Sequence, residues 1–418
     1  MFFHRLCPSI VAEKMSQEYH VPKSDLGVFS SIFFYPYALL QPFAGLMSDL
    51  IEPGYLMAVS HVIASVGALI CGMSKSLYVG CIGRFLVGVG CSPTYVPICR
   101  IVANWYKSEK MSTILGLLLA IGGLGSLSSQ GPLAAFSDKF GWRMSFYGIS
   151  AIGIFFSFLS FLFVKGDPRT LKFLPINNDC SVISPEGSLG DKMNALFDSS
   201  KEILSERCFW MVVLYNVFAS GPYFNIGGLW GAPYLTDVFG LTNQETGNIL
   251  MSLSVGLIVG SLCFPTITVI LKTQKWVLFS TSLLTSIAFC VFIIYGSSIS
   301  KTILYILFFA TGAFTNAMTS VSYPMIKGYF SSSVAGTSIG CANTFTFLSS
   351  AFFQQISSII IPKFGKQPNS TKYTEKGYQI GLWVVSLVSL FFSILFITFS
   401  IVQNDHLTEE EDGEISEI

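Results

Sequence analysis

The chain has 418 residues, of which 51% are hydrophobic, 15% aromatic and only 11% charged, and its formal net charge is zero. Soluble domains carry about 25% charged residues. The charged residues of this chain are therefore too few to cover the surface of a soluble protein of this length. The composition predicts a polytopic membrane protein and excludes a nucleic-acid-binding protein, because the chain has no basic stripe.

Residues 1–15 are predicted to form the second half of a helix, because the segment is too short to span a membrane and lacks the order of a signal peptide. We therefore expect the chain to begin partway along a first helix. Arg5 lies in this segment and is the first candidate for binding an anion, since an intramembrane Arg costs at least ~2.5 kcal/mol and is functional by default. The alternative is that Met1 begins the protein and Arg5 reaches the interface at a helix end.

Eleven long apolar segments follow, and most of them contain the about 20 residues that a helix needs to cross the hydrocarbon core. They cover residues 26–48, 56–74, 77–103, 112–136, 144–164, 209–232, 247–271, 276–298, 302–326, 334–362 and 378–402. Together they hold only two formally charged side chains, Arg84 and Arg100. Uninterrupted apolar runs favour helices over a barrel, so the predicted fold class is all-α with about 11 complete spans.

One long hydrophilic gap divides the spans into two sets. It defines an N-terminal helical bundle (1–164), a linker loop (165–208), a C-terminal helical bundle (209–402) and an acidic tail (403–418). Basic residues are almost equally numerous in the two sets of loops, so the positive-inside rule does not fix the orientation.

The two halves align as an internal repeat. One shift of the chain places Gly88 on Gly312, and a shift only four residues shorter places Arg5 on Asn225. Two nearly equal shifts favour a duplication of six spans, which is the pattern of many transporters.

Several short motifs resemble those of the major facilitator superfamily. GLMSDLIEPGYL supplies the Gly45 and Asp49 of the loop between the family's second and third helices, but without the basic residues that follow there. GRFLVGVG, GWRMSF and GLWGAPYLTDVFGL resemble segments of the fourth, sixth and seventh helices. The resemblance implies two six-helix bundles related by pseudo-twofold symmetry, with the first helix truncated here. It also implies that the linker loop and both ends of the chain are cytoplasmic.

The resemblance also suggests roles for the charged residues. Arg5 stands where organic-anion and organophosphate facilitators hold an anion-binding Arg, whereas Asn225 stands where the organophosphate carriers hold a second one, so a two-Arg phosphate clamp is not predicted. Arg84 contacts either the substrate or backbone carbonyls. Asp49 and Arg100 are candidates for the inner gate, although Arg100 could also reach the interface at its helix end. The other substrate-binding candidates are polar residues on the helices that line the family's cavity, namely Tyr35, Tyr95, Gln130, Asn225, Trp230 and Gln354.

The predicted function is a secondary active or facilitative transporter that moves a small organic solute across the bilayer by alternating access. The solute is expected to be an organic anion, a phosphorylated metabolite or a dipeptide, as for the lysosomal dipeptide carriers. The alternative is a transporter-like receptor or partner subunit that binds a ligand without moving it. The absence of Asp and Glu within the predicted spans favours uncoupled transport or exchange over proton symport.

The remaining expectations concern partners and location. We do not expect an enzyme, because the predicted spans lack clustered His, Asp or Glu. We expect no cofactor or metal site, since the ten cysteines follow no ligand spacing, and we expect a monomer. The membrane is either the plasma membrane or a lysosomal or vesicular one. Asn369 begins a glycosylation sequon in the loop before the last span, which the implied orientation places outside the cytoplasm.

Overall fold

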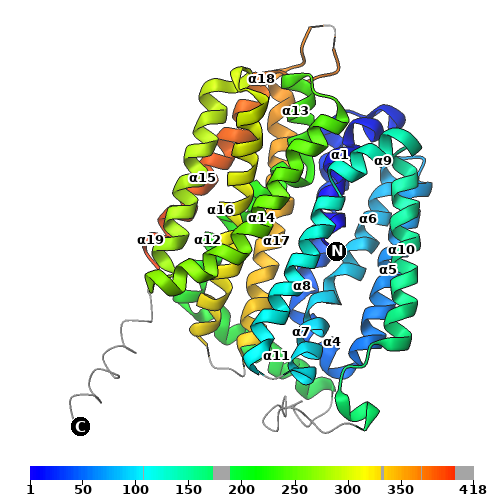
Figure 1. Cartoon of the computed structure of the whole chain (residues 1–418), viewed down its shortest axis with the longest axis vertical. Helices are drawn as coiled ribbons and strands as arrows, with labels where there is room; N and C mark the ends of the chain where they lie inside the picture. Colours follow the sequence, from blue (N-terminus) through cyan, green and yellow to red (C-terminus); the bar gives the residue numbers. More distant parts are fainter. Residues whose placement is uncertain (107, 173–188, 331–333, 369, 401–418) are drawn as a thin grey trace, which may run out of the picture.

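The computed structural model describes residues 1–106, 108–172, 189–330, 334–368 and 370–400, and these are almost entirely helical (Figure 1). Among the described residues, eight helical segments are long and apolar enough to cross a membrane, and a bent pair would add a ninth. The eight are Pro53–Met73, Leu77–Val102, Trp142–Phe163, Asn243–Leu271, Lys275–Ser298, Lys301–Gly328, Gly336–Phe364 and Glu375–Thr398. The predictions of an all-α fold and of a multi-pass integral membrane protein are thus confirmed.

Several of the eleven predicted spans are broken into shorter helices. Residues 26–48 form α2 (Leu26–Ser31), α3 (Phe34–Leu39) and α4 (Gln41–Leu50), with a bend of 49° before α4. Residues 112–136 lie in α8 (Ser108–Ser128) and α9 (Gly131–Phe140), and residues 209–232 in α12 (Arg207–Asn225), a π-helical segment (Ile226–Trp230) and α13 (Gly231–Phe239). Pro42 and Pro132 lie at the starts of α4 and α9, where a missing amide proton costs least.

The helices form two groups that lie side by side (Figure 1). In the first group, α5 (Pro53–Met73) packs against α6 (Leu77–Cys91) and α10 (Trp142–Phe163). In the second group, α14 (Asn243–Leu271) packs along α16 (Lys301–Gly328), while α12 packs against α17 (Ala335–Ile360) and α19 (Val385–Thr398). The outer positions are taken by α15 (Lys275–Tyr295), and α18 (Glu375–Tyr378) leads into α19 through a second π-helical segment. Gly256 and Gly260 permit the close approach of α14, because a Cβ at either would overlap the backbone of α16.

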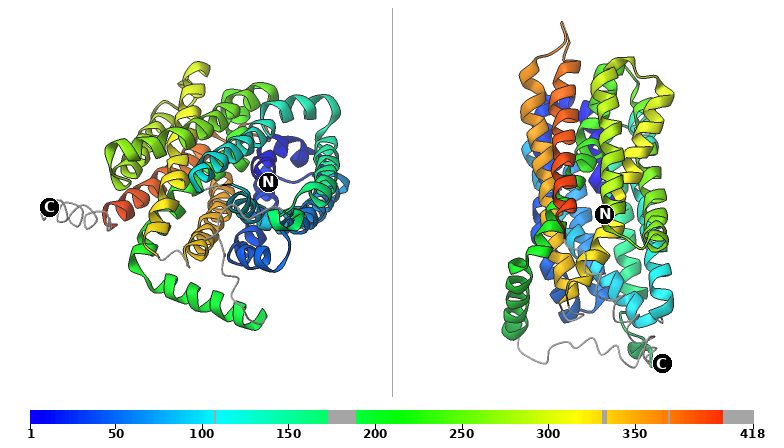
Figure 2. Two further views of the ribbon diagram at one scale, coloured as in Figure 1. Left: turned by 60° about the horizontal axis from the view of Figure 1, so that its bottom comes forward. Right: turned by 90° about the vertical axis from the view of Figure 1, so that its left-hand side faces the viewer.

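The linker between the two groups contains a helix that the sequence did not predict. In this hydrophilic stretch, α11 (Leu189–Ser205) lies at the lower end of the molecule in the view of Figure 1, and Figure 2 shows it running across that end. Met193, Leu196 and Ile203 recur at helical spacing, and Ile203 is fully buried. The apolar residues of an amphipathic surface helix are too few to be recognised as a span. Residues 173–188 of the linker and the predicted tail lie outside the described residues.

The first helix, α1 (Phe2–Tyr19), places Arg5 in the middle of the bundle. It ends at the upper end of Figure 1 with His20 in the left-handed conformation, while Met1 lies between the helices at about half the height of the molecule. Most of α1 is buried, including His4, Arg5 and Ser9. A single turn of α1 therefore presents a basic side chain to the space between the two helix groups.

Candidate functional site

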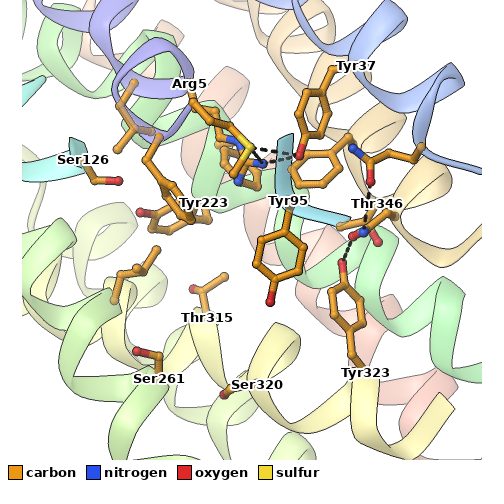
Figure 3. A pocket seen from close by; sticks show the side chains of 18 of the residues that line it. Arg5, Tyr37, Tyr95, Ser126, Tyr223, Ser261, Thr315, Ser320, Tyr323 and Thr346 are labelled. Carbon is orange, nitrogen blue, oxygen red and sulfur yellow. Dashed lines mark hydrogen bonds between the residues drawn. The ribbon is translucent and has the colours of Figure 1, made fainter. Parts of the chain in front are cut away.

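A central cavity lies between the two helix groups and receives side chains from both (Figure 3). The first group contributes residues of α1, α3, α4, α7 (Tyr95–Trp105) and α8, and the second group residues of α12, α14, α16 and α17. The lining residues are Met1, Phe2, Arg5, Leu6, Tyr37, Gln41, Tyr95, Ser126, Tyr223, Phe224, Leu257, Ser261, Thr315, Ser320, Tyr323, Ile339, Asn343, Thr346 and Phe347. Contributions from both groups make this cavity the place where a bound molecule would affect their relative position.

The guanidinium group of Arg5 is enclosed by aromatic rings. Its Nη2 donates to the Tyr37 hydroxyl at 2.6 Å, and the residue is only 8% exposed. The guanidinium carbon lies 4.6 Å from the ring centroid of Phe347, 4.9 Å from that of Tyr37, 5.0 Å from that of Phe2 and 6.0 Å from that of Phe224. Ring faces attract a cation and exclude water, so Arg5 is held in one place and largely desolvated.

The described residues that line the cavity include one positive side chain and no carboxylate. Arg5 is the only Lys or Arg among the residues that line it, and none of them is Asp or Glu. Arg5 Nε has no hydrogen-bond partner within the described part of the chain. Because an uncompensated charge in a low-dielectric site is unfavourable, an anion that reached Arg5 would be strongly stabilised.

Of the eight residues predicted from the sequence to bind substrate, Arg5 and Tyr95 line the cavity. Arg84 does not: it is fully buried beside α1, donates from Nη1 to the carbonyl of His4 at 2.8 Å, and donates from Nε to the carbonyl of Phe29 at 3.3 Å. Tyr35 is not among the residues that line the cavity, and it is 37% exposed.

The other four predicted residues lie behind the cavity wall and connect helices. Asn225 donates to Ser357, Trp230 donates to Ser358, and Gln354 donates to the carbonyl of Phe224. Gln130 accepts from Ser254 at the break between α8 and α9. All four are fully buried, so they fix the broken helices that carry the cavity residues.

The predicted inner-gate residues lie at the lower end of the molecule. Arg100 on α7 donates from Nη1 to the carbonyl of Ser48, the residue before Asp49 on α4. The side chain of Asp49 and the whole of Asn369 lie outside the described part of the structure. Within the described residues, no group of three or more His, Cys, Asp or Glu side chains could hold a metal ion.

A buried cluster of charges, not predicted from the sequence, joins the two helix groups at the upper end. Lys23, which precedes α2, places its Nζ 2.7 Å from Asp237 Oδ1 on α13, and it also pairs with Glu13. Asp237 Oδ2 accepts from the Tyr378 hydroxyl at 2.7 Å and from the Tyr373 amide at 3.1 Å. Lys23 is 4% exposed and the Asp237 side chain is 0% exposed. We call the Lys23–Asp237 pair the upper latch; its signal in the sequence was the single acidic residue of the motif GLWGAPYLTDVFGL (228–241).

Comparisons with known proteins identify the family. A family model described as Major Facilitator Superfamily matches residues 2–273 and 212–416. Among curated proteins, a hexuronate transporter of Bacillus subtilis is 26% identical over 58% of this chain and 55% of its own length. A probable sulfoacetate transporter of Cupriavidus necator is 25% identical over 40% of this chain and 39% of its own, and a sialic acid transporter of Escherichia coli is 23% identical over 59% and 58%. The aligned part of the chain thus spans about half the length of these relatives or less.

Solved structures share the fold. An inward-facing bacterial homologue of the human lysosomal transporter Spinster superposes with a TM-score of 0.70 at 16% identity, over 96% of this chain and 93% of the other. A D-xylose–proton symporter superposes with a TM-score of 0.68 at 12% identity, over 96% and 94%.

Proposed function

Because the chain belongs to the major facilitator superfamily, we propose that it carries a small organic anion across its membrane by alternating access. The observation that carries this proposal is the uncompensated guanidinium of Arg5 in a cavity between the two helix groups. The names of the curated relatives support it, since hexuronate, sulfoacetate and sialic acid are all organic anions. A phosphate clamp of two Arg residues receives no support, because Asn225 bonds to Ser357 behind the cavity wall.

The upper latch supplies the proposed gate on one side. It holds α13 of the second group against the start of α2 in the first, so it must break before the cavity opens at the upper end. Within the cavity wall itself, Asn343 donates to Gln41 and connects α17 to α4, so this contact must change before the cavity opens at the lower end. Opening the two ends in turn, with the anion bound at Arg5 between them, constitutes the transport cycle.

Uptake into proteoliposomes tests this function directly. Purified protein should take up labelled monovalent organic acids in a saturable manner with no pH difference across the membrane. Uptake should accelerate when the same acid is loaded inside, since the described spans contribute no carboxylate to the cavity for proton coupling. Binding of the acids without flux would support the alternative of a transporter-like receptor and contradict this proposal.

We further propose that the linker loop (165–208) and the tail (403–418) face the cytoplasm, as the family orientation implies. A cysteine placed at Asn369 should then react with an impermeant reagent added on the non-cytoplasmic side of the membrane. A cysteine placed at the exposed Asp198 of α11 should react with the same reagent only after permeabilisation. The reverse labelling pattern would invert this topology and leave the cavity argument unchanged.

A further inference from the structure

The wall of the cavity away from Arg5 presents hydroxyl groups that have already donated their protons. Thr315 Oγ1 on α16 donates to the carbonyl of Thr311 at 2.6 Å, and Ser261 Oγ on α14 donates to the carbonyl of Ile258 at 2.7 Å. A hydroxyl has one proton, so each of these oxygens retains only acceptor capacity toward the cavity. Figure 3 shows both side chains grouped on the side of the cavity opposite Arg5.

The other polar side chains of the cavity differ in whether they already have hydrogen-bond partners within the protein. Asn343 accepts from Tyr323 and donates to Gln41, so its amide is engaged within the wall. Tyr223 lies between Arg5 and Thr315 in Figure 3, is 4% exposed, and its hydroxyl has no partner in the described residues. Buried hydroxyls are seldom left unpaired, so Tyr223 is a further group that a bound molecule would satisfy.

The arrangement therefore has a cationic donor at one end and acceptors at the other. A complementary molecule carries an anionic group at one end and hydrogen-bond donors at the other. An ammonium donor would make the molecule a zwitterion and leave the Arg5 charge uncompensated, because no carboxylate is among the lining residues. A phosphate monoester carries a charge of about −1.5 to −2 at pH 7 and would leave an excess of negative charge in the desolvated site.

We propose that the solute is a monovalent carboxylic or sulfonic acid that bears hydroxyl groups on the carbons remote from the acid. The acid group binds the guanidinium of Arg5, and the remote hydroxyls donate to Thr315 and Ser261, with Tyr223 satisfied between them. This assignment rests on the proposed anion transport. It narrows the range of solutes that the sequence analysis left open, because it disfavours both phosphorylated metabolites and dipeptides.

Gluconate and hexanoate provide a matched pair of probes, since both are six-carbon monocarboxylates and only gluconate carries hydroxyls. The full-length protein in detergent should bind gluconate at least about 10-fold more tightly than glucose 6-phosphate. Thr315→Val and Ser261→Ala should each weaken gluconate binding about 3- to 10-fold, which is the range for one neutral hydrogen bond, and leave hexanoate binding unchanged. Calorimetric titration of each purified variant measures these ratios.

Thr285→Val is the matched control. The Thr285 hydroxyl is buried and donates to the carbonyl of Thr281 in the same way, but Thr285 lies on α15 and does not line the cavity. This variant should bind both acids as the unmodified protein does.

The outcomes separate this inference from the function on which it rests. If gluconate and hexanoate both bind and the Thr315 and Ser261 variants weaken them equally or not at all, the hydroxyl assignment is overturned while anion transport stands. Tighter binding of glucose 6-phosphate than of gluconate would overturn the proposal that the solute is a monovalent acid. If no acid in the panel binds or is taken up, the proposed function itself is refuted.

Discussion

Arg5→Gln is expected to weaken binding of gluconate by about 10- to 100-fold and to lower uptake in proportion. The variant removes the only positive side chain among the lining residues but keeps hydrogen-bond donors at the same place. A hydrogen bond to a charged group contributes about 1.5–3 kcal/mol, and every 1.4 kcal/mol is a tenfold change in affinity. Titration of the purified variant with gluconate gives the ratio, and proteoliposome uptake shows whether transport follows it.

Arg84→Gln provides a control with the same change of side chain. Arg84 is fully buried and donates to the backbone carbonyls of His4 and Phe29 away from the cavity. This variant should yield less folded protein, whereas the affinity of its folded fraction for gluconate should stay within about threefold of the unmodified value. Equal losses of affinity in the two variants would show that Arg5 acts through the fold rather than through the anion.

Arg5→Lys separates charge from geometry. Lysine keeps the positive charge but lacks the planar fork that binds a carboxylate through two parallel hydrogen bonds, and it stacks less well on aromatic rings. Since the guanidinium carbon lies within 5.0 Å of the ring centroids of Phe2, Tyr37 and Phe347, we expect an intermediate affinity. Affinity as poor as that of Arg5→Gln would mean that the planar geometry, and not the charge alone, determines binding.

The sequence predicted the spans better than the places where they break. Long apolar runs follow directly from the thickness of the bilayer, so the all-α multi-pass fold was accessible. The breaks depend on single residues, such as Pro42 and Pro132, whose effect is decided by whether neighbouring helices can satisfy the freed backbone groups. The π-helical segment after Asn225 has no comparable signal, because it lies in a continuous apolar run.

The residues that line the cavity were predicted only in part, because the type of a residue does not show whether its side chain is buried or which way it points. Arg5 and Arg84 are both intramembrane arginines in the sequence. In the structure, Arg5 lines the cavity, whereas Arg84 donates to the carbonyls of His4 and Phe29. The aromatic residues around Arg5 could not be singled out, since 38 phenylalanines are distributed along the chain. Thr315 and Ser261 are ordinary hydroxyl residues of apolar helices until the structure shows which way they face.

The upper latch escaped prediction because its partners are far apart in the sequence and one lies in a short polar turn. Lys23 was counted among the loop charges, which are normally solvated, but it is nearly fully buried against Asp237. A buried charge pair of this kind can be recognised only when the structure shows its two distant segments side by side. Its burial also makes its energetic effect large enough to measure.

Lys23→Met is expected to shift the protein toward conformations that are open at the upper end. Among the described residues, the substitution leaves the buried Asp237 carboxylate with the Tyr378 hydroxyl and the Tyr373 amide as its partners. Removing one member of a buried ion pair costs about 3–5 kcal/mol in the state that buries it, and opening the upper end would relieve this cost by hydrating Asp237. A change of this size alters the ratio of closed to open conformations by more than about 100-fold.

Asp237→Asn should have a smaller effect than Lys23→Met, because Lys23 keeps its pairing with Glu13. The double variant Lys23→Met/Asp237→Asn should lie closer to the unmodified protein than Lys23→Met alone, since the fully buried carboxylate of Asp237 is then replaced by a neutral amide. This order distinguishes a latch from a pair of residues that merely support folding. Independent structural roles would give additive losses instead.

Spin labels on the two helix groups can measure the shift. Lys139 at the end of α9 and Ser297 after α15 are both exposed and lie on different groups, so cysteines at these positions, in a background without reactive native cysteines, report the separation of the groups. We expect Lys23→Met to populate longer distances than the unmodified protein, and to slow exchange of gluconate because the cycle then stalls with the upper end open. If Lys23→Met kept the distance distribution and the exchange rate of the unmodified protein, the buried pair would not be a gate.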